Sequence, residues 1–398
     1  MKTFCHKRLE KGKGAAVRRT ARRVHSKQAL TLCVKAQAIS RLVARHQGGL
    51  PGLNPVRLLA LMQAAIVRCK LDLTGAVVLT EAGSNAYVVT PVLAALAGAT
   101  RVYAVVRSTR FGSACAVREQ AQQLAVMAGV GDVIRYVSRK TQEIIGQADI
   151  VTNSGHVRPI DAQTIGWMKP QAVVPLMYES WELRMGDIDL SSARRRAIAV
   201  AGTNERQVAV GVFDFLGVMA VKGLLDAGIA VQGTRILLLC DNAFRAYIRA
   251  GLVGCGAVVD CRRDLEKADR CGCRAYDAIV LALHPGRGKT LEQTDARTVA
   301  TTWPGAVVLH FWGNMDRRAF QVAGVPVWPL HEPRQGHMGV LPSEVGPESI
   351  VRLQSGGLKV GEILWRARHS GHSVAEAIAC AVQTGFGQRV CLPFRSGG

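Results

Sequence analysis

The sequence predicts an α/β fold made of two successive parallel-sheet domains. The first observation is the length of the chain. Its 398 residues, of which 48% are hydrophobic and 20% charged, are more than one ordinary hydrophobic core accommodates. The second is that short apolar stretches alternate with helical patterns, which is typical of strand–helix–strand units. The third is that this alternation pauses at a long apolar stretch and starts again after Gly233.

The first domain is expected over residues 51–205 and begins with an amphipathic helix at 55–69. Its apolar stretches predict strands at 76–83, 101–108, 133–138, 148–156, 172–182 and 197–205. Helical patterns lie between them at 84–96, 114–128 and 162–168. Strands and helices in this order are typical of a Rossmann-like unit.

A connecting helix is expected over 206–232, because residues 208–227 are mostly apolar. The second domain, 233–340, is predicted to be a smaller Rossmann-like unit with a helix at 243–253. Its strands are predicted at 234–242, 257–264, 276–286, 305–314 and 325–333. Residues 341–398 are expected to form a C-terminal loop and helices. The Gly- and Pro-rich stretch 334–349 predicts the loop, and helices are predicted at 356–371 and 375–387.

The basic charge is concentrated at the N-terminus, which is expected to be an extension over residues 1–50. Residues 1–71 hold 16 Lys and Arg against the single acid Glu10, which accounts for +15 of the net +22. Aromatic side chains that could stack on bases are nearly absent from this segment. Nucleic acid is therefore a possible partner that the sequence does not favour over a solvated basic helix.

The cysteines and the hydropathy indicate a cytoplasmic protein without a membrane partner. Eleven cysteines are scattered without a regular framework, and no signal-peptide pattern precedes them. The apolar stretches are interrupted by polar residues and Pro91, so none is expected to span a membrane. Cys261, Cys271 and Cys273 have no recognised zinc spacing, so no metal is expected.

Polar residues follow the strands of the first domain, where an open parallel sheet binds its ligands. The first turn, E-A-G-S-N, lacks the G-x-G-x-x-G fingerprint, but Gly83 allows close backbone approach. Arginine stands after the second strand, where an acid would bind a free ribose, and this favours the 2′-phosphate of NADP over NAD. The predicted cofactor-binding residues are Gly83, Ser84, Asn85, Arg107, Ser108 and Asn153.

The predicted catalytic residues are His156, His337 and Glu182. Imidazole titrates near working pH and suits acid/base catalysis. Arg158 and Arg184 are predicted clamps for a carboxylate or phosphate, because a planar guanidinium binds two oxygens at once. The other predicted substrate-binding residues are Asn204, Glu205 and Asn314, which would line an interdomain cleft with the two arginines.

Two tandem Rossmann-like units joined by a helix resemble the superfamily of D-2-hydroxyacid dehydrogenases and S-adenosylhomocysteine hydrolases. WMKPQAVV at 167–174 is similar to that family's helix-end M-K-x-G-A, and PGAVVLHFWGNMDRRAF at 304–320 is similar to its G-A-x-x-x-N segment. The resemblance spans about residues 72–340 and implies chemistry in the cleft between the units. Trp312 stands where the dehydrogenases have a catalytic arginine, so hydroxyacid oxidation itself is not implied.

Three functions are open at this point. The first is an NAD(P)-dependent oxidoreductase or nicotinamide-assisted lyase that acts, as a homodimer, on a small anionic metabolite in the interdomain cleft. The second is an S-adenosylmethionine-dependent methyltransferase, which would usually have an acid in place of Arg107. The third is a non-catalytic metabolite- or nucleic-acid-binding protein, which the two absent glycine fingerprints and the basic N-terminus favour.

Overall fold

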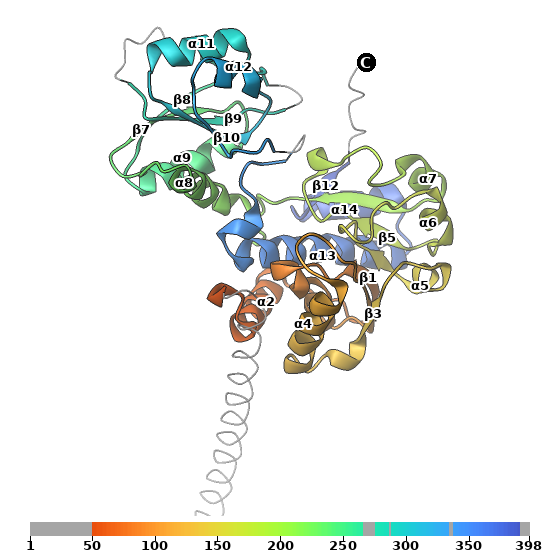
Figure 1. The fold of residues 1–398 in the computed structure, drawn as a ribbon. Coiled ribbons are helices and arrows are strands. Elements are labelled where there is room, and N and C mark those ends of the chain that lie inside the picture. The colour runs from red at the N-terminus through yellow and green to blue at the C-terminus, as the bar shows by residue number, and fades with distance from the viewer. Residues whose placement is uncertain (1–49, 266–274, 286–287, 334–336, 391–398) are drawn as a thin grey trace, which may run out of the picture.

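The computed structural model describes residues 50–265, 275–285, 288–333 and 337–390 (Figure 1). Its strands form one sheet of seven and one of five, each in its own unit, which confirms the predicted α/β class with two Rossmann-like units. In Figure 1 the second unit, coloured green to cyan, stands beside the first. The expected basic extension lies outside the described residues except for Leu50.

The first sheet has the strand order β12-β6-β5-β4-β1-β2-β3. Its first six strands along the chain are parallel, and β12 pairs antiparallel with β6 at the edge. The direction of winding reverses between β1 and β4, which is the topological switch point. The strands are β1 (Val77–Glu81), β2 (Arg101–Val105), β3 (Ile134–Val137), β4 (Ile150–Val151), β5 (Val173–Pro175), β6 (Ala199–Thr203) and β12 (Gly387–Arg389).

Helices cover both faces of the first sheet, so its strands are apolar on both sides. Val78 faces one core and Leu79 the other, and both are fully buried. One face carries α2 (Pro55–Cys69), α3 (Val89–Leu96), α4 (Ala114–Met127), α13 (Pro347–His369) and α14 (Val374–Gln383). The other carries α5 (Gln142–Gln147), α6 (Ala162–Trp167) and α7 (Leu190–Arg195).

The C-terminal segment belongs to the first unit. The loop predicted at 334–349 is shorter than expected, because α13 begins at Pro347, nine residues before the predicted helix start at 356. The first residue of a helix makes no intrahelical hydrogen bond through its backbone N–H, so a proline, which lacks this group, is tolerated there. Pro347 can therefore begin the helix. Gly361 lets α13 approach the sheet, since a Cβ there would stand 2.8 Å from Ile150 Cγ2. Strand β12, which follows α14, was not predicted.

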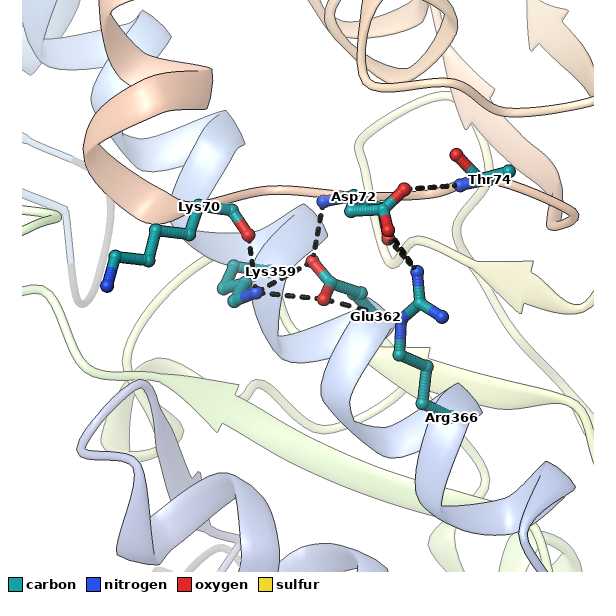
Figure 2. Close-up of polar contacts among 6 residues, drawn as sticks. All are labelled: Lys70, Asp72, Thr74, Lys359, Glu362 and Arg366. Atoms are coloured by element: carbon teal, nitrogen blue, oxygen red, sulfur yellow. Dashed lines mark hydrogen bonds and ion pairs between the residues drawn. The ribbon is translucent and has the colours of Figure 1, made fainter.

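A cluster of hydrogen bonds and ion pairs, which we call the polar cluster, holds α13 against the connection between α2 and β1 (Figure 2). Lys359 Nζ donates to both Glu362 oxygens at 2.8 and 2.9 Å and to the Lys70 carbonyl at 2.7 Å. Glu362 also accepts the Asp72 backbone N–H at 2.9 Å, and Arg366 pairs with the Asp72 carboxylate. Lys359 and Glu362, two titratable residues that follow the predicted loop, therefore hold α13 in place.

The second unit has the strand order β11-β10-β9-β7-β8, with all strands parallel. The strands are β7 (Arg235–Leu239), β8 (Val258–Arg262), β9 (Ala278–Ala282), β10 (Val307–Trp312) and β11 (Val327–Trp328). Helices α8 (Leu216–Asp226) and α9 (Phe244–Gly254) cover one face, and α11 (Gln293–Thr302) and α12 (Arg317–Val322) the other. The switch point of this sheet lies between β7 and β9.

The connecting helix is shorter than the predicted 206–232. The chain turns through residues 205–212, where Gly211 has a left-handed φ of 58°, and the short 3-10 helix η5 (Phe213–Phe215) leads into α8. Helix α8 packs closely on α9, because a Cβ on Gly251 would stand only 2.4 Å from Gly217 Cα. It is thus the first helix of the second unit rather than a free connector.

Within the described ranges, the helices include none that combines the length and apolar character needed to cross a bilayer.

Candidate functional site

A cavity of about 870 Å³ opens at the switch point of the first sheet, beyond the carboxyl ends of β1 and β4. It brings together five of the predicted site residues: Gly83, Ser84, Asn85, His156 and Arg158. The turn after β1 and the loop after β4 carry them, as the parallel topology requires. Segment 50–53, Lys222 of α8 and the loop 341–347 complete its walls, so the cavity borders the second unit as well.

Glu81 and His156 meet at the base of this cavity. The Glu81 carboxylate accepts the backbone N–H of His156 at 2.7 Å, and the ring Nδ1 lies 3.9 Å from the same oxygen. Nδ1 is also 3.3 Å from the Val105 carbonyl, which can only accept, so Nδ1 carries the proton. In the neutral ring this tautomer leaves Nε2 as a proton acceptor.

Arg158 is held in a second network beside His156. Its Nη1 donates to Asp187 Oδ2 at 2.9 Å, and Tyr178 donates to the same oxygen at 2.6 Å. Asn153 donates to the Tyr178 hydroxyl at 2.7 Å and accepts the Met177 N–H. Asn153 is fully buried, so its amide orders these loops instead of facing the cavity.

A smaller pocket, of about 220 Å³, lies between the two units. Trp181, in the short 3-10 helix η4 (Ser180–Glu182) after β5, reaches the second unit and packs on Trp312, Phe244 and His284, with ring centroids 4.9, 6.2 and 6.0 Å away. Glu179 and Arg206 complete the wall from the first unit, and Asn242 the wall from the second. Both units thus contribute residues near the carboxyl ends of their sheets to one pocket. None of the residues predicted to line the interdomain cleft, which are Arg158, Arg184, Asn204, Glu205 and Asn314, lies in it.

Three carboxyl groups lie close together beside this pocket. Glu179 accepts from Trp181 Nε1 at 2.5 Å and from Gln388 at 3.1 Å, and burial raises its pKa. Burial and the neighbouring Glu179 raise the pKa of Glu182 to about 7. Burial and both of these carboxylates raise the pKa of Glu205 well above its usual value. Groups of perturbed pKa in a cleft are typical of functional sites.

An arginine-lined groove of about 510 Å³ lies at the start of α9, and we call it the arginine groove. Arg245 and Arg249 project from one face of the helix at i and i+4, and Arg263 comes from the end of β8. Asp241, Ala246 and Ala250 also line it, and Asn242 and Ala243 line both this groove and the interdomain pocket. The two cavities therefore follow each other along the carboxyl edge of the second sheet.

His337 does not join His156. It lines a separate cavity of about 600 Å³ at the end of β10, together with His310 and Asn314. Asn314 donates to the Pro285 carbonyl at 2.7 Å, and burial lowers the pKa of His310. The two predicted acid/base histidines thus belong to different sites.

The other predicted site residues lie outside these cavities. Arg107 and Arg184 are exposed, and Ser108 Oγ accepts the N–H of Ala114 at the start of α4. Asn204 donates to the Gly385 carbonyl and so supports the turn before β12. Reasoning from the sequence missed Glu81, Trp181 and the arginine groove. The i, i+4 spacing of Arg245 and Arg249, with Arg263 after the next strand, was the available signal.

Among the described residues, no three His, Cys, Asp or Glu side chains are grouped as a metal ion would require.

Comparison with known proteins gives a likeness of fold. No protein-family model and no curated protein matches the chain. A dipicolinate synthase chain from Bacillus subtilis is 12% identical, with a TM-score of 0.48 over 78% of this chain and 99% of that one. The corresponding dipicolinate synthase chain from Bacillus halodurans is also 12% identical, with a TM-score of 0.46 over 71% and 96%.

NAD-dependent formate dehydrogenase from Staphylococcus aureus, solved in complex with NAD, is 12% identical, with a TM-score of 0.43 over 74% of this chain and 95% of that one. The duplicated Rossmann-like architecture that the resemblance implied is present in this structure, as two parallel sheets in two units.

Proposed function

We propose that the chain is an NADP-dependent oxidoreductase that moves a hydride between the cofactor and a hydroxyl or carbonyl group of a small substrate. The cofactor would lie along the carboxyl edge of the second sheet, and the substrate in the cavity at the switch point of the first. The observation that carries this proposal is the continuity of the arginine groove with the interdomain pocket through Asn242 and Ala243. Together they form an elongated site with a phosphate-binding end and an aromatic end.

The arginines support a phosphorylated cofactor. Arg263 follows β8, the second strand of its sheet, where an arginine can bind a 2′-phosphate. Arg245 and Arg249 stand one helical turn apart, and like charges at this spacing repel each other. A bound phosphate would relieve that repulsion through charge-assisted hydrogen bonds. The pyrophosphate would lie near the first turn of α9, and the nicotinamide ring would extend past the aromatic pocket toward the first-unit cavity, where it would meet the substrate.

This placement differs from the sequence-based one, which put the cofactor on the first sheet. There the Glu81 carboxylate lies at the first turn, and it would repel a pyrophosphate. Asp241 lies at the equivalent turn of the second sheet, but three arginines line the same groove. Gly83 is required by packing, because a Cβ would stand 2.7 Å from Tyr87 Cβ. His156 would serve as the base: its Nε2 takes the hydroxyl proton of the substrate as the hydride leaves for the cofactor.

Titration calorimetry on the full chain tests the proposal, with NADPH, NADH, adenosine and S-adenosylmethionine as ligands. We expect NADPH to bind more tightly than NADH, and Arg263→Ala to weaken NADPH binding about 10- to 100-fold while leaving NADH unchanged. Arg107→Ala is the matched control, since Arg107 stands after the second strand of the other sheet.

Three results would speak against the proposal. Loss of NADPH affinity in Arg107→Ala alone would return the cofactor to the first unit. Preference for S-adenosylmethionine would favour the methyltransferase. Binding of neither nucleotide, with salt-dependent nucleic-acid affinity that is lost on deleting residues 1–45, would favour a non-catalytic binding protein. A cytoplasmic homodimer stays a prediction from the sequence.

A further inference from the structure

We infer that the substrate of the first-unit cavity is a neutral alcohol, or the corresponding ketone or aldehyde, with an extended apolar body. The inference rests on the proposed function for the reaction, but its argument concerns the walls of this cavity alone. It replaces the small anionic metabolite that the sequence led us to expect.

The charges at the cavity disfavour an anion. Its two cations are neutralised within the protein: Arg158 pairs with Asp187 at 2.9 Å, and Lys222 with Asp226 at 2.5 Å. Glu81 and Glu344 also line the cavity. Two cations and four carboxylates therefore lie at or next to the cavity. Their net negative charge would repel a substrate carboxylate. Arg184, the other predicted clamp, does not line the cavity.

The polar end of the cavity suits a hydroxyl or carbonyl group. His156 Nε2 and the Glu81 carboxylate are acceptors for a hydroxyl proton, and the Arg158 guanidinium is a donor for the oxygen. Gly155 leaves space between them, because a Cβ there would stand 3.2 Å from Glu81 Oε2 and 3.7 Å from Arg158 Nη2. One oxygen that both donates and accepts can satisfy this set without carrying a charge.

The remaining walls are apolar and come from segments far apart in the sequence. Leu53 is buried, whereas Phe111 is 58% exposed and Leu50 60% exposed at the same cavity. Leu341 and Pro342, which follow β11 in the chain, also line the cavity. Large apolar side chains gathered in the open around a cavity mark a binding surface. An apolar body of the substrate would cover them.

The reaction balances with the proposed cofactor. With NADP⁺ bound, the carbon that bears the hydroxyl would give up its hydride to the cofactor and the hydroxyl proton would pass to His156 Nε2, which would leave a ketone or aldehyde and NADPH. In the reverse reaction His156 would return the proton to the carbonyl oxygen.

Calorimetric binding of 2-butanol, 2-octanol and octanoate to the full chain saturated with NADPH tests the inference, because none of these can react with the reduced cofactor. Each buried methylene should tighten binding about fourfold, so 2-octanol should bind on the order of 100-fold more tightly than 2-butanol. Octanoate should bind more weakly than 2-octanol.

The Phe111→Ala variant tests whether the apolar walls of this cavity bind the alkyl chain of 2-octanol. It should weaken 2-octanol about tenfold and leave 2-butanol unchanged. The matched control is Val322→Ala, which trims an apolar side chain that is 78% exposed on α12 and outside the cavity. Octanoate binding as tightly as 2-octanol, equal affinities for the two alcohols, or equal effects of the two variants would overturn the inference. Failure of NADPH itself to bind would instead count against the proposed function.

Discussion

Trp181 and Trp312 lie with their ring centroids 4.9 Å apart across the boundary between the two units. Trp181 is the last aromatic residue of a loop that follows β5, and Trp312 ends β10. The first belongs to the proposed substrate unit and the second to the proposed cofactor unit. Any change in the distance between the units must therefore change this contact.

Trp181→Ala should uncouple the two units. It removes ring contacts with Trp312, Phe244 and His284, each worth about 0.5–1.5 kcal/mol beyond burial. Differential scanning calorimetry should show one transition for the unmodified chain and two for the variant. Trp181→Phe keeps a ring and serves as control, and a single unshifted transition in Trp181→Ala would contradict the expectation.

Glu182→Gln should change how stability depends on pH. The folded pKa of Glu182, about 7, lies above its ordinary 4.5, so between these values the folded state binds more protons than the unfolded state. The free energy of unfolding therefore falls as the pH rises through this window, and Gln removes that loss. At pH 8 the variant should be more stable by about 1 to 3 kcal/mol, and at pH 4 equally stable.

Glu376→Gln is the opposite control, measured by the same urea titrations at each pH. Hydrogen bonds from the Ser373 backbone N–H lower the pKa of Glu376, so its stabilisation is present above pH 4.5 and is lost on acidification. Its replacement should lower stability at pH 8. Identical pH profiles for the two variants would show that Glu182 is not perturbed.

Glu362→Ala should destabilise the first unit by about 3 kcal/mol. The substitution leaves Lys359, which is 13% exposed, without its carboxylate, and breaking a buried ion pair costs more than the pair contributes. Urea unfolding would measure the loss, and Lys359→Met with Glu362→Met should restore much of it. Arg366→Ala, at the exposed end of the polar cluster, should lower the free energy of unfolding by less than about 1 kcal/mol. NADPH affinity should stay constant throughout.

Gly361→Ala should destabilise the protein, although the same change in an ordinary helix stabilises it by about 1 kcal/mol. The new methyl group would press on Ile150 and on Pro175, 3.1 Å away, at a cost of about 1–3 kcal/mol. Gly166→Ala in α6 meets open space and should be stabilising. If the thermal midpoint rises in both variants, α13 does not pack closely on the sheet at Gly361.

The sequence predicted every strand of both sheets except β12, because alternation of apolar strands and helices is local information. It placed His156 and Arg158 correctly at a strand end, since parallel topology alone brings the ends of β1 and β4 together. It could not show that Arg158 is neutralised by Asp187, 29 residues away, or that Trp181 reaches the second unit. The start of α13 was predicted nine residues too late because Gly346 and Pro347, at which the helix begins, are typical of loops.

The return of α13, α14 and β12 to the first sheet makes the second unit an insertion, complete within the chain of the first. During synthesis all five strands of the second unit are made before α13 emerges. The N-terminal unit lacks its central covering helix and its edge strand until residues 347–389 have been made. The order of folding on the ribosome should therefore be reversed, with the unit that is later in the sequence completed first.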